Sequence, residues 1–204
     1  MFTTIIVALI TAVVGPIVVE WVKSKIKKHE QEEKPSPVKE AIDINEIIDH
    51  QLDTIIEELN CDRVWLAQFH NGGHFYPTGK SIAKFSMVYE AVEQGTNSIQ
   101  TNFQNIPVNL FNRAINELLE NDIIEIKDYK DPTVATFGLK DVAENSKNKS
   151  SYLFAIKNFE GKFIGALGVD YTKRKTELNH DDINQLLVYT TSIGGVLNNH
   201  LTKQ

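Results

Sequence analysis

The chain has 204 residues, of which 42% are hydrophobic and 24% are charged, proportions typical of a globular protein with room for one domain and additional segments. Its net charge of -6 argues against a basic surface for DNA or RNA, so no nucleic-acid partner is expected. The single cysteine, Cys61, excludes an internal disulfide and a zinc site with several cysteine ligands.

The first segment of the chain is strongly apolar. Residues 2–19 are almost all apolar or threonine, Gly15-Pro16 interrupts them, and Trp21 follows where an interfacial aromatic residue would lie. A run of about twenty such residues matches the thickness of a bilayer core. Because no basic region precedes the run and no small-residue cleavage pattern follows it, we predict a retained transmembrane helix over residues 1–22 rather than a signal peptide or a buried core helix. Proline removes a helical hydrogen bond, so we expect a kink at Gly15-Pro16.

Residues 23–41 are predicted to form a charged linker. Lysines follow the apolar run directly, acidic residues come next, and Pro35 and Pro37 close the segment. By the positive-inside rule, the lysines place the rest of this single-pass protein on the cytoplasmic side of the inner (cell) membrane. They are also suited to contact anionic headgroups, so membrane lipid is an expected partner. The lysines are Lys23, Lys25, Lys27 and Lys28.

An amphipathic helix is predicted after this linker, with Asp43 and Glu46 as an N-terminal capping pair. Its apolar residues recur at spacings of four and three, which place them on one helix face over about four turns. Two interpretations stay open: part of this face covers a sheet while the rest forms a homodimer through flanking helices, or all of it belongs to the intramolecular core. The face consists of Ile44, Ile48, Leu52, Ile55 and Leu59, widened by Ile47 and Ile56.

The stretch DRVWLAQFHNGG, residues 62–73, is the centre of the predicted fold. Its side chains alternate so that Trp65 and Phe69 share one face, while the opposite face becomes polar toward His70. The final Asn-Gly-Gly tolerates positive φ and begins a polar loop. This pattern predicts a strand that leaves a core and ends at a site.

The remainder of the chain predicts strands and helices without an internal repeat. The expected elements are a strand over residues 83–93, a helix with Pro107 in its first turn, a strand over residues 123–127, an irregular connection over residues 128–149, a hairpin with strands at 152–156 and 163–171, and a last helix with Asn179 as N-cap. The irregular connection is either a lid over a site or a mobile loop. This order predicts an α+β fold with a mainly antiparallel sheet flanked by helices.

The hairpin SYLFAIKNFEGKFIGALGVDYT, which leads into the last helix, resembles the corresponding part of GAF domains. In that family a strand of the pattern G-x-x-I/L-G-A/V-L precedes the final helix, and FEGKFIGALGVD is similar to it. The resemblance implies a GAF-like domain over residues 42–204, with a small molecule bound between sheet and loops and dimerisation through flanking helices. The Asn-Lys-Phe-Asp-Glu signature of cyclic-nucleotide binders has no counterpart here, and Cys61 opens the first strand instead of lying at the position of a bilin-carrying cysteine.

An anchor followed by one such domain is also similar to uncharacterised proteins of tailed phages and bacteria. That setting suggests an alternative function, a holin-like lysis protein of a phage with a single membrane span and a soluble regulatory domain. The stretch GALGVDYTKRKTELNHDDINQLL is loosely similar to the end of such a domain. A holin of this type carries its soluble domain in the periplasm, which conflicts with the lysines after the apolar run.

The sequence contains no motif of an enzyme. His70 and His74 are separated by Gly-Gly and do not form the helical His-Glu-x-x-His pattern, and neither Glu90 nor Asp170 is fixed as a third metal ligand. A serine nucleophile elbow, a P-loop and a base beside Cys61 are missing as well. We therefore predict a protein without catalytic activity, metal or cofactor.

Recognition of a small molecule is the function that the polar residues favour. Donors, acceptors and an aromatic ring lie on a loop held by a rigid strand, an arrangement typical of small-molecule sites. We predict that this loop and three residues of the sheet close one end of a ligand pocket; in the competing interpretation, the same residues only stabilise the loop. The loop residues are His70, Asn71, His74, Tyr76 and Lys80, and the sheet residues are Tyr89, Glu90 and Asp170.

Overall fold

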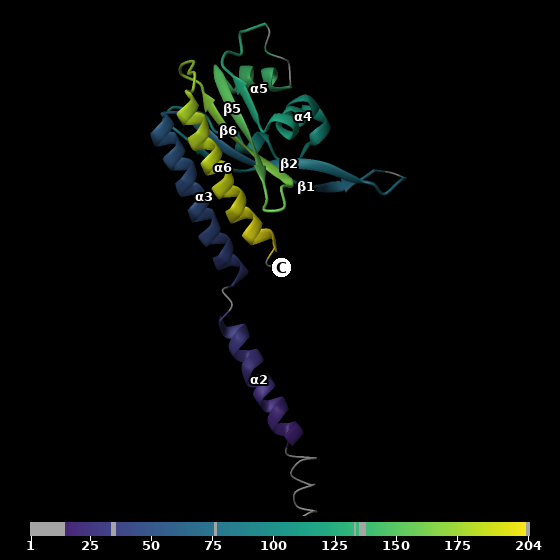
Figure 1. The fold of residues 1–204 in the computed structure, drawn as a ribbon. Helices are drawn as coiled ribbons and strands as arrows, with labels where there is room; N and C mark the ends of the chain where they lie inside the picture. Colours follow the sequence, from purple (N-terminus) through teal and green to yellow (C-terminus); the bar gives the residue numbers. More distant parts are fainter. Residues whose placement is uncertain (1–14, 34–35, 76, 133, 135–137, 203–204) are drawn as a thin grey trace, which may run out of the picture. The chain divides into compact units, whose positions relative to one another are not determined.

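The computed structural model describes residues 15–33, 36–75, 77–132, 134 and 138–202 (Figure 1). The chain forms two units, residues 1–43 and residues 44–204. The first unit contains helix α2 (Gly15–Glu33) and the beginning of helix α3 (Pro37–Leu59), which continues into the second unit. Much of the stretch predicted to be a linker is therefore helical.

Helix α3 begins earlier than the sequence pattern predicted. The backbone N–H of Lys39 donates to the Ser36 hydroxyl (3.1 Å), and the N–H of Glu40 donates to the Ser36 carbonyl (3.0 Å). Ser36 is thus the N-cap, because its side chain and carbonyl satisfy the first free donors of the helix. The prediction of a helix start at Asp43 was wrong for this reason.

The predicted membrane anchor is only partly within the described residues. Residues 1–14, which make up most of it, lie outside them. Within the segments that the structure describes, no helix combines the length and the apolar character needed to cross a bilayer. The anchor stays a prediction from sequence.

Six antiparallel strands form one sheet in the second unit, in the order β3-β2-β1-β6-β5-β4. The central pair is β1 and β6, aligned from Arg63 opposite Asp170 to Gln68 opposite Gly165. This arrangement confirms the predicted α+β fold with an antiparallel sheet, including the hairpin of β5 and β6. The strands are β1 (Arg63–His74), β2 (Ser81–Val92), β3 (Ile106–Pro107), β4 (Ile123–Ile126), β5 (Ser150–Lys157) and β6 (Phe163–Tyr171).

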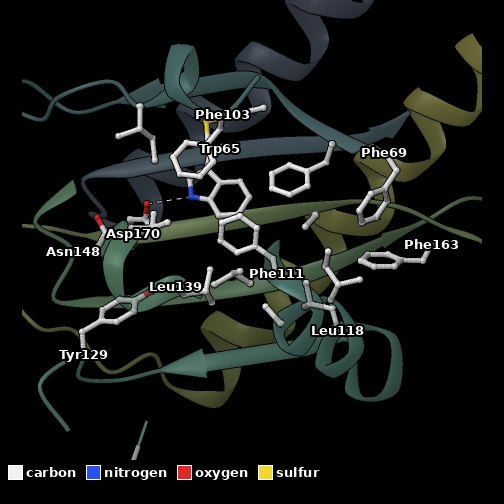
Figure 2. Close-up of a pocket in the computed structure, with 18 residues that line it drawn as sticks. Trp65, Phe69, Phe103, Phe111, Leu118, Tyr129, Leu139, Asn148, Phe163 and Asp170 are labelled. Carbon is white, nitrogen blue, oxygen red and sulfur yellow. Dashed lines mark hydrogen bonds between the residues drawn. The ribbon is translucent and has the colours of Figure 1, made fainter. Parts of the chain in front are cut away.

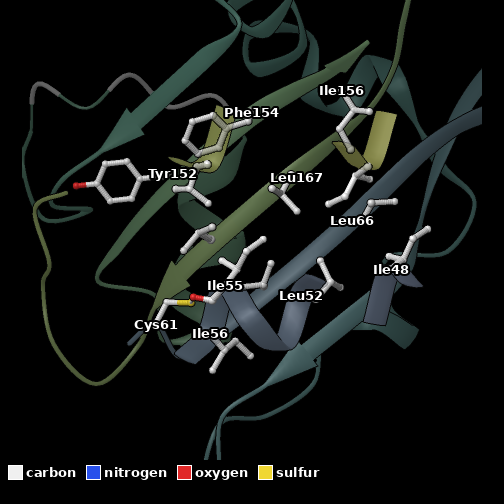
Figure 3. Packing of buried hydrophobic residues seen from close by; sticks show 14 of the residues in the cluster. Ile48, Leu52, Ile55, Ile56, Cys61, Leu66, Tyr152, Phe154, Ile156 and Leu167 are labelled. Atoms are coloured by element: carbon white, nitrogen blue, oxygen red, sulfur yellow. The ribbon is translucent and has the colours of Figure 1, made fainter. Parts of the chain in front are cut away.

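One face of the sheet is covered by α3 and by α6 (His180–Thr202), which lie side by side (Figure 1). Alternate strand residues, such as Tyr152 and Phe154 of β5, point into a core with Leu52 of α3 and Leu186 of α6 (Figure 3). All four of these side chains are fully buried, so this layer is close-packed. The predicted apolar face of α3 is divided: Ile48, Leu52 and Ile55 are buried, whereas Ile47 is exposed.

The last helix begins as predicted. The side-chain oxygen of Asn179 accepts hydrogen bonds from the backbone N–H groups of Asp181 (2.8 Å) and Asp182 (3.0 Å). In return, the Asp182 carboxylate accepts from the N–H of Asn179 (3.0 Å). The reciprocal pair is a capping box, which confirms Asn179 as the N-cap.

Shorter elements cover the opposite face of the sheet. They are the 3-10 turns η2 (Gln100–Asn102) and η3 (Val108–Phe111) and the helices α4 (Asn112–Asn121) and α5 (Leu139–Ser146). Pro107, expected in a first helical turn, instead ends the edge strand β3 opposite Lys84, a place that suits a residue without an N–H. Helix α5 lies inside the stretch predicted to be irregular.

Candidate functional site

A cavity lies between the second face of the sheet and these shorter elements (Figure 2). Space of about 80 Å³ inside it is open to a water-sized molecule. A neighbouring hollow of about 170 Å³ shares Ile99, Phe103 and Val142 with the cavity. The cavity is lined by Trp65, Phe69, Phe85, Met87, Ile99, Phe103, Phe111, Ala114, Ile115, Leu118, Tyr129, Leu139, Val142, Asn148, Leu153, Phe163, Ala166 and Asp170.

Seven of the 18 residues that line the cavity are aromatic. The rings of Phe69 and Phe163 meet edge to face with centroids 4.8 Å apart, and those of Phe85 and Phe111 do so at 5.6 Å. Edge-to-face contacts of this kind fix ring orientation as well as adding apolar area. The strands and helices thus hold a rigid apolar chamber instead of filling the space.

Gly168 makes room for the central ring of this wall. A Cβ atom at this position would lie 2.1 Å from Cε2 and Cζ2 of Trp65. The indole therefore lies directly across β6, where its Nε1 donates to Oδ2 of Asp170 (3.1 Å). A glycine in the GALGVD stretch is required for the position of the cavity wall.

The polar end of the cavity is formed by Asp170, Asn148 and Tyr129 (Figure 2). Oδ1 of Asp170 accepts a hydrogen bond from the Ser151 hydroxyl (2.6 Å), and Nδ2 of Asn148 donates to the same hydroxyl oxygen (3.3 Å). Burial, together with the neighbouring Asp170 carboxylate, raises the pKa of Tyr129 well above its usual value, so the phenol stays protonated at neutral pH.

Arg63 is the hub behind this polar end, and its side chain is 0% exposed. Its Nη1 donates to Oδ2 of Asp170 and to Oδ1 of Asn148, both at 3.0 Å, and Nη2 donates to the Asn97 carbonyl at 2.7 Å. Nε lies 3.3 Å from Oε1 of Glu90, at ion-pair distance but without hydrogen-bond geometry. A guanidinium that is cut off from water in this way has to be compensated by the surrounding carboxylates.

Glu90 connects this network to the cavity roof. Its carboxylate accepts hydrogen bonds from the backbone N–H groups of Ile99 (2.8 Å) and Gln100 (3.1 Å), and the Ser98 hydroxyl also donates to it. These bonds hold the start of η2, whose flanking residues Ile99 and Phe103 line the cavity. The position of the roof therefore depends on a buried charge.

Residues 43–197 match the family model for the GAF domain. The chain belongs to the GAF domain family. Solved GAF domains to which it is similar include the phycocyanobilin-bound GAF domain from a cyanobacterial phytochrome, with 16% identity, a TM-score of 0.63 and coverage of 91% of this chain and 97% of that one. At this identity the likeness shows the fold alone.

Two further solved GAF domains are similar to this chain in fold at equally low sequence identity. The blue-light absorbing form of the Thermosynechococcus elongatus PixJ GAF domain has 17% identity, a TM-score of 0.62 and coverage of 78% of this chain and 88% of that one. The photoproduct state of GAF3 from Slr1393 of Synechocystis sp. PCC6803 has 16% identity, a TM-score of 0.59 and coverage of 76% and 94%. Comparison with curated proteins gave no match.

The sheet residues predicted for the site are divided between the two faces of this GAF domain. Asp170 lines the cavity, and Glu90 is joined to it through Arg63. Tyr89 packs against the core beneath α3, where its hydroxyl donates to Oδ1 of Asn45 (2.5 Å). The structure thus brings Asp170 and Glu90 together and places Tyr89 elsewhere.

The predicted loop residues lie at the end of the β1–β2 hairpin, which extends beyond the sheet (Figure 1). Asn71, His74 and Lys80 are exposed, and none of them lines the cavity. Nε2 of His70 is hydrogen-bonded to the Ser86 hydroxyl (2.9 Å). Tyr76 lies outside the described residues, and the ligand role of this loop stays a prediction.

Sequence reasoning missed the residues that build the cavity. The alternation in β1 puts Trp65 and Phe69 on one strand face, which is the cavity face, but the polar residues predict a site in the loop instead. Arg63 and Tyr129 were not singled out. Among the residues that the structure describes, no group of three or more His, Cys, Asp or Glu side chains is arranged to hold a metal ion.

Proposed function

We propose that this GAF domain is a sensory module that binds a small, mainly apolar molecule in the aromatic cavity. The observation that carries the proposal is the cavity itself: an apolar chamber with a few convergent polar groups at one end, which is the usual form of a small-molecule site. A cavity of about 150 Å³ is large enough for benzene. The space of about 80 Å³ and the adjoining hollow of about 170 Å³ suit a molecule of about one ring.

A bilin, such as the phycocyanobilin bound to one similar GAF domain, does not fit this chain. The thiol of Cys61 points to the carbonyl of Ile55 (3.9 Å) within the core beneath α3, on the opposite side of the sheet from the cavity. Burial raises the pKa of this thiol to about 12, so it is a poor nucleophile. The open space is also well below the roughly 300–1,000 Å³ of pockets for drug-sized ligands.

Binding without catalysis is the activity that the lining supports. The described lining residues include no His, Cys, Ser or Lys that could act as nucleophile or general base. The carboxylate of Asp170 is engaged by Arg63, Trp65 and Ser151. We therefore infer that ligand binding changes the conformation or the stability of the domain and not the ligand.

Anchoring and dimerisation are further parts of the proposal. The apolar residues 2–19 support a tether that holds the domain at the cytoplasmic face of a membrane, and exposed Ile17, Val19 and Trp21 of α2 fit a lipid environment. Exposed Ile47 of α3 and Val188 of α6 support a homodimer through these helices. Reporter fusions at the C-terminus test the topology, since activity only in the periplasm would favour the holin alternative instead.

The cavity proposal is tested by thermal-shift screening of the full-length chain against small aromatic and aliphatic metabolites and nucleotides. We expect a stabilising compound whose effect is lost in Ala166→Leu, which fills the cavity, and kept in Ala83→Leu, which makes the same change at an exposed position of β2. A shift that survives Ala166→Leu, or no shift with any compound, would overturn the proposal. The double variant His70→Ala, Asn71→Ala tests the hairpin loop separately.

A further inference from the structure

The polar end of the cavity has spare hydrogen-bond acceptors. Asp170 accepts three bonds, from Arg63, Trp65 and Ser151, whereas a carboxylate has about four acceptor sites. Within the described part of the chain, the unused site is on Oδ1, which accepts a hydrogen bond there from Ser151 alone. A ligand that reaches this end therefore meets a carboxylate oxygen with free capacity.

The neighbouring groups add a further acceptor. Ser151 donates its single hydroxyl hydrogen to Asp170 and accepts from Asn148. Oδ1 of Asn148 uses one of its two lone pairs for Arg63. The Tyr129 phenol and the second N–H of Asn148 are donors at the same end, so hydrogen bonding alone admits both donor and acceptor groups of a ligand, and charge has to decide between them.

The buried charges favour a cation at the same place. The positive Arg63 lies between two negative carboxylates, Asp170 and Glu90, so the three side chains leave one excess negative charge. Asp62 adds none, because it is paired with Lys173 at 3.3 Å. Asp170 is also the only charged residue among the described residues that line the cavity. An excess charge away from water is stabilised by an opposite charge brought next to it.

The walls suit the rest of such a ligand. Trp65 lies beside Asp170, and Phe103 and Phe111 flank its indole ring (Figure 2). Aromatic faces attract ammonium groups, most strongly where water is excluded, and they also pack against an apolar body. The cavity therefore combines a negative end with an aromatic chamber.

We propose that the cavity selects a small amphipathic amine, with its ammonium group at Asp170 and its apolar part against Trp65 and the phenylalanine rings. This inference rests on the proposed function, because it presupposes that the cavity binds a ligand. It names the chemical class: a protonated primary amine on a body of about one ring. An uncharged molecule of the same shape lacks the contact with Asp170, and a carboxylate is repelled there.

Three probes with the same phenyl ring and different charge test the proposal on the full-length chain: benzylamine, toluene and benzoate. The chain has two tryptophans, so Trp21→Phe leaves Trp65 as the only tryptophan, and its emission reports on the cavity directly. We expect saturable binding of benzylamine at neutral pH with an affinity about tenfold or more above that of toluene, since the amine gains a charge-assisted hydrogen bond. Benzoate should not bind.

In Asp170→Asn, the affinity for benzylamine should fall to within about threefold of the affinity for toluene, because the amide keeps the shape of the side chain and removes its charge. Tyr129→Phe leaves every buried charge in place. It should weaken the binding of benzylamine by less than Asp170→Asn does, and it should leave the binding of toluene unchanged. Should Asp170→Asn not fold, the ranking of the probes on Trp21→Phe alone decides. If toluene or benzoate binds as tightly as benzylamine, the proposed selectivity for an amine is wrong, although the cavity is still a binding site. If no probe binds saturably, the proposed binding function is wrong as well.

Discussion

Replacement of the buried arginine should be among the most damaging single changes in the domain. In Arg63→Met the carboxylates of Asp170 and Glu90 keep their burial but lose the cation between them. Removing one partner of a buried ion pair costs about 3–5 kcal/mol, because the remaining charge is uncompensated. Methionine fills part of the same volume, so we assign this loss in the free energy of unfolding to charge and hydrogen bonding and not to a cavity.

Urea unfolding of the full-length chain measures this loss, with Arg174→Met as the matched control. Arg174 is exposed, and its Nη2 lies at the long distance of 3.4 Å from the Asn60 carbonyl, so its replacement should change stability by less than about 0.5 kcal/mol. The triple variant Arg63→Met, Asp170→Asn, Glu90→Gln should lose less free energy of unfolding than Arg63→Met alone, because no unpaired charge stays buried in it.

The triple variant separates charge from packing, because it removes the buried charges and keeps the methionine at position 63. A deficit of Arg63→Met below about 1 kcal/mol, or one that the triple variant does not reduce, would refute the electrostatic reasoning.

Three further predictions concern other parts of the domain. Gly168→Ala should displace the Trp65 indole from Asp170, shift its emission and cost about 1–3 kcal/mol in urea unfolding. Burial alone would raise the pKa of Asp62, but hydrogen bonds from Lys173 and Thr172 lower it below its usual value. The ionised Asp62 therefore stabilises the folded domain above about pH 4, and this contribution is lost as pH falls. In Asp62→Asn, the free energy of unfolding should depend less on pH in the acid range. Cys61, with its pKa raised to about 12, should react with a thiol reagent only at the rate of unfolding, and rapid labelling of the native chain would contradict its buried position.

The elements that the sequence predicted correctly are those with local signals. The β5–β6 hairpin follows from alternation on both sides of Glu160-Gly161, where Gly161 has a φ of +73°. Asn179 is followed by His180 and then by two acidic residues, a pattern typical of a helix start. Both signals lie within a few residues of the structure that they predict.

Elements that depend on distant partners were missed. Pro107 has a helix-compatible φ of −63°, but its ψ of 131° is extended because it pairs with Lys84 on the neighbouring strand. Helix α5 spans eight residues between Gly138 and Lys147, both at positive φ, and is too short to give a periodic pattern. Neither outcome is encoded by the adjacent residues alone.

Arg63 shows why the candidate site was only partly predictable. A charged residue at the start of a strand is usually exposed, and its burial here depends on Asp170 and Glu90, which are far away along the chain. Asp170 was named from the sequence without the partner that explains its position. The polar loop drew attention because polar residues are the usual sign of a site, whereas this cavity is lined almost entirely by apolar residues.

Both faces of the sheet carry alternating apolar side chains, and alternation cannot distinguish a filled core from an empty chamber. The difference arises from the covering elements. On one face, two helices of 23 residues each lay long apolar stripes on the sheet and close it. On the other face, the described covering elements are helices of 10 and 8 residues and two 3-10 turns, and Glu90 holds one of those turns in place. The space that remains beside Trp65 is a consequence of these lengths and of a buried carboxylate, which is why a cavity forms among residues that look like core.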